Sequence, residues 1–214
     1  MDADRRRLSC WAENFNEGRN IDSAYALRIL KSGAHIGDVP ALFYLRLHAD
    51  GFRFLKAEGV DLFQREANGN TLLMNVLESL DLEAYRFLAE EFARHGAIDW
   101  AEEEGITPLS SMIKFGEVDY ARILLENGAS IHTFGTIARY GGSRLDIPTQ
   151  AVICTGGQTK EEQQRKGIAG LKLLKEFGYK PDRAEVERLI DKARRLNRHA
   201  IADWLAGNLM PPKA

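Results

Sequence analysis

A single stretch of sequence, residues 105–132 (GITPLSSMIKFGEVDYARILLENGASIH), constrains the fold of this chain most. Thr107 can cap the start of a helix, and Pro108 would occupy the first turn, where the N–H that proline lacks would have no helical partner. Three apolar side chains then fall on one face of that helix: Leu109, Met112 and Ile113. The first half of the segment therefore predicts a short amphipathic helix.

The second half of the segment predicts another helix, from about Val118 to Glu126. Its inward-facing side chains at helical spacing would be Tyr120, Ala121, Ile123 and Leu124. Gly128 follows at a position where helices commonly end in the left-handed conformation. Such a helix-turn-helix unit cannot bury its apolar face alone, so we expect several units to stack.

This segment resembles the ankyrin repeat. The residues that carry the resemblance, all in register, are Thr107-Pro108-Leu109, Gly116, Leu124-Leu125 and Gly128-Ala129. Ser110 departs from the family pattern, which usually has histidine here, so we expect one buried side-chain hydrogen bond to be replaced or lost. The resemblance implies an all-α solenoid of stacked helix-turn-helix units with turn or hairpin tips, and about five to six helical pairs including the caps.

A second copy of the pattern begins at Gly69, in GNTLLMNVLESLDLEAYRFLAEEFARHGAID. The matching positions of its first helix are Thr71, Leu73, Val76 and Leu77. Those of its second helix are Tyr85, Phe87, Leu88 and Phe92. From opening to closing glycine this copy is four residues longer than the 105–132 segment, about one helical turn, so we expect a lengthened second helix.

We expect residues 1–214 to form a single ankyrin-repeat domain, because stacked repeats behave cooperatively. Its parts would be an N-terminal capping unit (1–38), a divergent repeat (39–68), a repeat (69–104), the best-matching repeat (105–134), a repeat with inserted loops (135–181) and C-terminal capping helices (182–214).

The charge and the cysteines narrow the possible functions. With 29 basic and 31 acidic residues the net charge is −2, so no overall field favours nucleic acid or an anionic membrane. Cys10 and Cys154 lie far apart and form no metal-ligand spacing, which favours a reducing compartment. The five histidines are scattered along the chain, with no pair on one helical face. We expect a cytoplasmic protein without cofactor or metal that is monomeric before it binds a partner.

The segment CTGGQTK, residues 154–160, lacks the Walker spacing, and we interpret it as a flexible loop. The alternative to a binding protein is an enzyme or a small-molecule-binding protein, with its site in the 135–165 insertion around Tyr140, Arg144 and Cys154. A lone cysteine at the end of an apolar run is more often a small buried hydrophobe than a nucleophile, so we expect no catalytic residue.

Ankyrin-repeat proteins generally bind partner proteins along a concave side, formed by turn tips and exposed positions of the first helices. Carried over to this sequence, that surface would comprise Glu66, Asn68, Asn70, Glu78, Trp100, Glu102, Glu103, Glu104, Ile106, Lys114, Phe115, Phe134, Arg139 and Tyr140. The aromatic residues could anchor a partner within an acidic rim, or they could pack the turns onto the helices. We expect a non-catalytic adaptor or stoichiometric inhibitor, of which an immunity-type inhibitor is one form, with a partner that has a basic surface.

Overall fold

A computed structural model describes residues 2–19, 22–75, 81–137 and 143–211 of the chain. The chain forms two compact units, Met1–Glu103 and Glu104–Ala214, named unit 1 and unit 2 from here on. Both units consist mainly of helices, so the predicted all-α repeat class is confirmed. Among the described residues, no helix is both long enough and apolar enough to cross a bilayer. The single domain expected for residues 1–214 stays a prediction.

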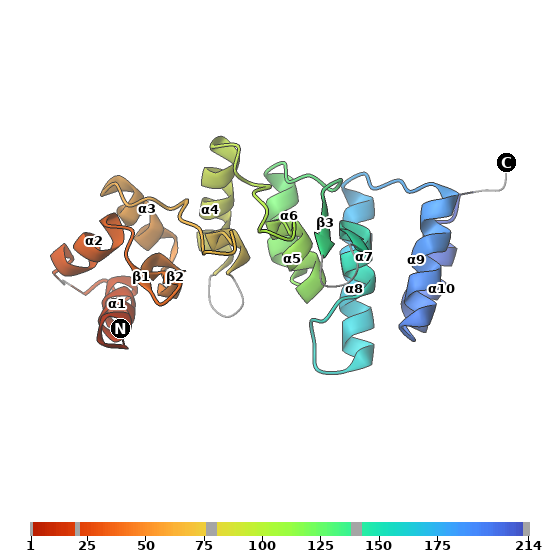
Figure 1. Ribbon diagram of the computed structural model, residues 1–214, viewed down its shortest axis with the longest axis horizontal. Helices are drawn as coiled ribbons and strands as arrows, with labels where there is room; N and C mark the ends of the chain where they lie inside the picture. The colour runs from red at the N-terminus through yellow and green to blue at the C-terminus, as the bar shows by residue number, and fades with distance from the viewer. Residues whose placement is uncertain (1, 20–21, 76–80, 138–142, 212–214) are drawn as a thin grey trace. The chain divides into compact units, whose positions relative to one another are not determined.

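Unit 1 runs from red to yellow in Figure 1 and ends before α5. Its elements, with η for a short 3-10 helix, are α1 (Asp2–Asn16), α2 (Ala24–Lys31), β1 (His35–Ile36), β2 (Val39–Pro40), η1 (Ala41–Tyr44), α3 (Ala49–Ala57), η2 (Leu72–Met74) and α4 (Leu82–Arg94). β1 and β2 pair antiparallel, with Ile36 opposite Val39. Helix α3 packs against both α1 and α4, and the core of the unit includes Leu8, Phe52 and Leu88.

The lengthened second helix predicted for the 69–104 repeat is confirmed. Helix α4 has 13 residues, whereas α6 (Val118–Glu126), the second helix of the best-matching repeat, has 9. Asp81 caps α4, because its carboxylate accepts a hydrogen bond from the Ala84 N–H at 2.6 Å. The first helix of this repeat is described only at η2, and the predicted positions Val76 and Leu77 lie outside the described residues.

Glu91 on α4 is a buried carboxylate with two cationic neighbours. Its side chain is 2% exposed, and its Oε2 lies 2.6 Å from the Lys56 ammonium, while Arg94 pairs with Oε1. Burial by itself raises the pKa of this carboxyl. The hydrogen bond from Lys56 and the charges of Arg94 and Lys56 lower the pKa by more than burial raises it, so the pKa of Glu91 lies below its ordinary value. Through Lys56 this cluster joins α3 to α4.

Unit 2 begins at Glu104 and runs from green to blue in Figure 1. Its elements are α5 (Pro108–Phe115), α6, β3 (Phe134–Ile137), β4 (Ser143–Asp146), α7 (Ile147–Val152), α8 (Lys160–Glu176), α9 (Arg183–Arg195) and α10 (His199–Asn208). Helix α6 has the predicted bounds, and Gly128 after it takes the left-handed conformation at φ 87°. Ala121, Ile123 and Leu124 are buried, whereas Tyr120 is half-buried.

Thr107 and Ser110 explain how the best-matching repeat tolerates the missing family histidine. The Thr107 side chain accepts a hydrogen bond from the Ser110 N–H at 3.3 Å, and the Ser110 hydroxyl oxygen accepts one from the Thr107 N–H at 3.0 Å. This reciprocal pair is a capping box, with Pro108 at the first helical position. The expected hydrogen bond is therefore replaced by a local one.

The segment for which inserted loops were expected begins with a β-hairpin, β3 and β4. β3 and β4 pair antiparallel, with Gly135 opposite Leu145. Asp146 ends β4 and starts α7, because one of its carboxylate oxygens accepts from the Thr149 N–H at 2.9 Å. The other accepts from Arg188 of α9 at 2.6 Å, which fixes α7 to α9.

Residues 154–159 form a loop, as expected, and this loop packs against the end of α5. The Thr155 N–H donates to the carbonyl of Lys114 at 2.8 Å. Gly156 lies so close to the end of α5 that an added Cβ would come within 1.6 Å of the Phe115 carbonyl oxygen. Thr159 then caps α8, which begins at Lys160, so the polar residues that follow are helical. The loop is held in place because it covers carbonyl groups that the end of α5 leaves without helical partners.

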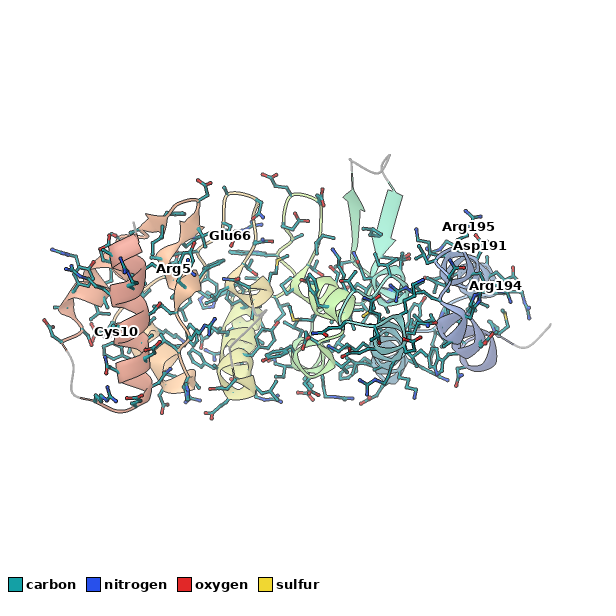
Figure 2. The ribbon with its side chains drawn as sticks, turned by 90° about the horizontal axis from the view of Figure 1, so that it is seen from below. Arg5, Cys10, Glu66, Asp191, Arg194 and Arg195 are labelled. Carbon is teal, nitrogen blue, oxygen red and sulfur yellow. The ribbon has the colours of Figure 1, made fainter. Side chains whose placement is uncertain are left out.

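The predicted C-terminal helical pair is α9 and α10, and α8 is fixed to it by two glutamines. Gln163 accepts from the Arg198 guanidinium at 3.0 Å, and Gln164 accepts from the Ala200 N–H at 3.0 Å. The solvent face of α9 carries an i,i+4 ion pair, with Arg195 2.7 Å from Asp191; Figure 2 labels both residues.

Candidate functional site

The turn at residues 65–71 of unit 1 is a short, tightly closed tip. Arg65 and Thr71 form an antiparallel bridge, and the Glu66 N–H donates to the Asn70 carbonyl at 3.0 Å. Gly69 has φ 87°, a left-handed conformation that glycine adopts without steric cost. The Asn70 side-chain amide also donates to Glu66 Oε2 at 2.8 Å, which orients that carboxylate. Glu66 is labelled in Figure 2, on the turn that projects from the helices of unit 1.

Arg65 fastens this tip to the next one, at residues 100–103. Its Nε donates to the Gly69 carbonyl at 2.9 Å, and its terminal nitrogen donates to the Ala101 carbonyl. In addition, the Glu103 N–H donates to the Asn68 carbonyl at 2.9 Å. The two neighbouring tips are thus joined by hydrogen bonds, so their surfaces have a defined geometry before any partner arrives.

Trp100 is one of the few large apolar side chains exposed among the described residues, at 38%. Its ring lies 6.4 Å from Phe63 and 6.5 Å from Phe92 between ring centroids. The Arg65 guanidinium carbon lies 5.5 Å from the centre of the same ring, within cation–π range. Trp100 therefore packs the turn onto the helices and still keeps an exposed face.

A shallow hollow of about 360 Å³ lies between the two tips. The hollow is lined by Arg65, Glu66, Ala67, Gly69, Ala101, Glu102 and Glu103. Three of these residues are carboxylates, whereas the single cation is already hydrogen-bonded to backbone carbonyls. We call the hollow and the adjoining Trp100 the tip surface. Its chemistry suits a cationic side chain beside an apolar one, because the carboxylates attract positive charge and the indole offers apolar area.

A comparison with protein-family models identifies the type of repeat that contains these two tips. Residues 44–134 match the family model for ankyrin repeats, in three copies. Residues 44–134 of the chain are ankyrin repeats. The match includes both tips of the tip surface and the best-matching repeat up to β3. No curated protein matches the sequence. Ankyrin repeats generally mediate interactions between proteins.

The remaining residues predicted for the ankyrin surface belong to unit 2 or lie outside the described residues. In unit 2, Glu104 is half-buried and Ile106 is buried at 9% exposure, so the Ile106 side chain contributes to packing. Lys114 and Phe115 lie at the C-terminal end of α5, about 10 Å along the helix from Thr107. The Lys114 ammonium nitrogen lies 5.5 Å from the centre of the Phe115 ring. The other four are Phe134, whose side chain is not described, and Glu78, Arg139 and Tyr140, which lie outside the described residues.

Sequence reasoning did not place Arg65, Ala67, Gly69 and Ala101 at the binding surface, although they line the hollow. Arg65 stands directly before the tip that had been recognised, so its position gave a weak signal. Its role depends on the carbonyl of Ala101, which is 36 residues away in the sequence. No local pattern predicts that contact.

The insertion around Cys154 was the site of the alternative, enzymatic interpretation. Cys154 is fully buried. Burial raises the pKa of its thiol, an effect that the Gly156 N–H and the charges of Arg198 and Lys166 only partly offset. A raised pKa keeps the thiol protonated at neutral pH, whereas a nucleophilic cysteine acts as the thiolate. Arg144 has no described side chain, and no group of three or more potential metal ligands gathers in the part of the chain that the structure describes.

Proposed function

We propose that this protein is a non-catalytic binding module, an adaptor or a stoichiometric inhibitor, that engages a basic surface of a partner protein through the tip surface of unit 1. The observation that supports this most is the open face of Trp100 beside a hollow with three carboxylates. An aromatic anchor beside a polar rim is the composition typical of the energetic centre of protein interfaces.

The rigidity of the tips supports the proposal energetically. Binding costs free energy when it must order loops and side chains. Here the Arg65 guanidinium joins both tips and stacks on Trp100, and Asn70 orients the Glu66 carboxylate. Little ordering is left for the moment of association, so more of the contact energy goes into affinity.

The charge of unit 1 supports a basic partner. Residues 1–103 contain 12 basic and 18 acidic residues, a net charge of −6, although the whole chain has a net charge of only −2. An acidic field of this size accelerates encounter with a cationic surface, and salt weakens that effect. An enzyme with a basic active-site cleft is one partner that such a surface could cover, which is how an inhibitor of the immunity type would act.

Three further parts of the proposal concern the protein outside its complex. We place it in the cytoplasm, as a monomer before it binds, and without nucleic-acid or membrane ligands. The two free cysteines, one exposed and one buried, fit a reducing compartment.

A pair of charge-reversed variants tests the proposal. Glu66→Lys/Glu103→Lys reverses two charges of the tip surface, and Glu13→Lys/Glu90→Lys makes the same net change on α1 and α4. A partner is first captured with the wild type and with the Glu13→Lys/Glu90→Lys variant, and is then purified. The purified partner should bind Glu66→Lys/Glu103→Lys at least tenfold more weakly than it binds the wild type. If purified partners bind both variants equally, the tip surface is not the binding site.

A further inference from the structure

Unit 2 contains a second hollow that the proposed function does not use. It has a volume of about 380 Å³ and lies along α8 and the first turn of α10. The lining residues of α8 include Glu161, Arg165, Ile168 and Lys172, which recur every three or four positions and therefore share one helical face. Ala200 forms the opposite wall. We call this feature the α8 groove.

The walls of the α8 groove are fixed to each other. Gln164 of α8 accepts a hydrogen bond from the Ala200 N–H at 3.0 Å, at the start of α10. The adjacent Gln163 accepts one from Arg198, the residue before α10, at 3.0 Å. The polar segment that lengthens α8 toward its N-terminus therefore builds the groove and holds it open.

The floor of the groove is apolar and only partly covered. Ile168 and Ala169 are half-buried, and Ala200 is exposed. The apolar share of the accessible lining is larger than the polar share. Such a strip between two helices matches the recognition mode in which an amphipathic helix places its apolar face into a groove.

Two cations without partners stand at the groove. Among the described residues, neither Arg165 nor Lys172 makes an ion pair or a side-chain hydrogen bond, and both are exposed. Two other cations of α8 are engaged, because Lys166 pairs with Glu117 at 3.5 Å and Lys175 donates to the Asn208 carbonyl at 2.9 Å. Arg165 and Lys172 are therefore unpaired cations that line the groove; among the described residues Lys160, the first residue of α8, is also without an ion pair, but it does not line the groove.

The spacing of the two cations indicates the geometry of an occupant. Arg165 and Lys172 are seven residues apart on α8, about 10 Å along the axis. Two carboxylates seven residues apart on another helix have the same separation and lie on nearly the same face. Unit 2 as a whole has 17 basic and 13 acidic residues, a net charge of +4, which steers acidic ligands toward it.

We propose that the α8 groove binds an acidic amphipathic helix of a partner protein. Apolar side chains of that helix lie on Ile168 and Ala169, and carboxylates on its flank pair with Arg165 and Lys172. Glu161, at one end of the groove, favours a basic residue at the corresponding end of the ligand, which sets its direction. This site is independent of the tip surface and takes a ligand of the opposite charge.

The test uses the full chain and a fluorescent synthetic helical peptide of about 16 residues, long enough to form a helix on binding. It has leucines on one face and glutamates seven residues apart beside them; a second peptide has lysine in place of glutamate. We expect the wild type to bind the glutamate peptide in the micromolar range and the lysine peptide at least tenfold more weakly, by fluorescence anisotropy. Amide NMR shifts on titration should centre on Ile168, Ala169 and Ala200.

Three variants locate the binding. Arg165→Glu/Lys172→Glu should weaken binding of the glutamate peptide at least tenfold, whereas Lys180→Glu/Arg194→Glu, an equal change at exposed positions away from the groove, should leave it within twofold. Ala200→Glu places a carboxylate at the groove in the first turn of α10, where it suits the helix dipole and does not threaten folding. It should also weaken binding at least fivefold.

Several outcomes overturn the proposal. The peptide could fail to bind at about 1 mM, bind equally with lysine in place of glutamate, or bind all variants alike. Sedimentation could instead reveal a dimer that only the Arg165→Glu/Lys172→Glu variant abolishes, which would make a second copy the occupant. The wild type could also bind phosphatidylserine vesicles but not the peptide. If Arg165→Glu/Lys172→Glu abolished that vesicle binding, the groove would be assigned to a membrane surface.

Discussion

Unit 1 and unit 2 are both built from helical pairs, but they carry opposite charge. Unit 1 has a net charge of −6 and unit 2 of +4, so the value of −2 for the chain conceals two surfaces that attract different ligands. The difference shows that a net charge near zero for the whole chain does not exclude strongly charged binding surfaces within it. A local acidic surface in one unit and a local basic groove in the other can coexist in a nearly neutral chain.

The two units also hold their irregular segments in different ways. In unit 1, the tips at 65–71 and 100–103 are joined by hydrogen bonds from an exposed side chain, Arg65. In unit 2, the loop at 154–159 is held by close packing, with Gly156 against the backbone of Phe115. Close packing leaves no room for a side chain, whereas surface hydrogen bonds tolerate substitution with a small loss.

The largest effect is expected at the packed loop of unit 2. Gly156→Val would place side-chain atoms where the Phe115 carbonyl lies, so we expect a loss of about 3 kcal/mol or more in the free energy of unfolding, measured by urea denaturation. The control is Gly207→Ala in α10, where an added Cβ meets nothing within 4 Å and helix propensity predicts a gain of up to about 1 kcal/mol. Equal stability of Gly156→Val and wild type would contradict the close packing.

The next effect concerns the buried charge of unit 1. Glu91→Gln removes the anion that Lys56 and Arg94 surround, and we expect a loss of about 2 kcal/mol at neutral pH, measured by thermal and urea unfolding. Glu90→Gln on the exposed side of the same helix should change the free energy of unfolding by less than about 0.5 kcal/mol. Similar losses in both variants would show that Glu91 has no special role.

The same carboxylate gives unit 1 an acid sensitivity. Because the pKa of Glu91 is lower in the folded than in the unfolded chain, its contribution is fully present above the ordinary glutamate value of 4.5 and is lost as the pH falls through the folded-state value. Between pH 7 and pH 3 the wild type should therefore lose more stability than Glu91→Gln. Parallel pH profiles of unfolding for the two proteins would rule out this linkage.

A smaller effect is expected at the hydrogen-bonded tips of unit 1. Arg65→Lys keeps the positive charge, but a lysine lacks the planar fork that donates to both the Gly69 and Ala101 carbonyls. We therefore expect the free energy of unfolding to fall by about 1 kcal/mol and amide exchange at the Glu103 N–H to become faster. Hydrogen exchange read by NMR or mass spectrometry measures this effect locally. Unchanged exchange in the tip would mean that Arg65 does not hold it.

The smallest effect sharpens the comparison of charges. Glu66→Lys/Glu103→Lys in unit 1 and Arg165→Glu/Lys172→Glu in unit 2 should each leave the free energy of unfolding within about 0.5 kcal/mol of wild type, because Glu103, Arg165 and Lys172 are exposed and Glu66 is only half-buried. Calorimetry on the purified variants measures this directly. A large loss in either variant would assign those charges to folding rather than to binding.

The sequence by itself determined the parts of the fold that depend on neighbouring residues. Helical periodicity predicted α6 with the bounds observed, Thr107 and Pro108 predicted the start of α5, and glycine spacing predicted the extra turn of α4. These features follow from capping, from side-chain spacing and from the left-handed conformation of glycine, which all act within a few residues.

Only the tertiary structure decided the features that join distant residues. Three contacts each connect segments about 35 to 40 residues apart. They are the hydrogen bond from Arg65 to the Ala101 carbonyl, the packing of Gly156 on Phe115, and the hydrogen bond from the Ala200 N–H to Gln164. These contacts pack the 154–159 loop onto α5, connect the walls of the α8 groove and join two turns into the tip surface. A hydrogen bond or a close contact across such a distance depends on how whole helices pack, and no local sequence pattern encodes it.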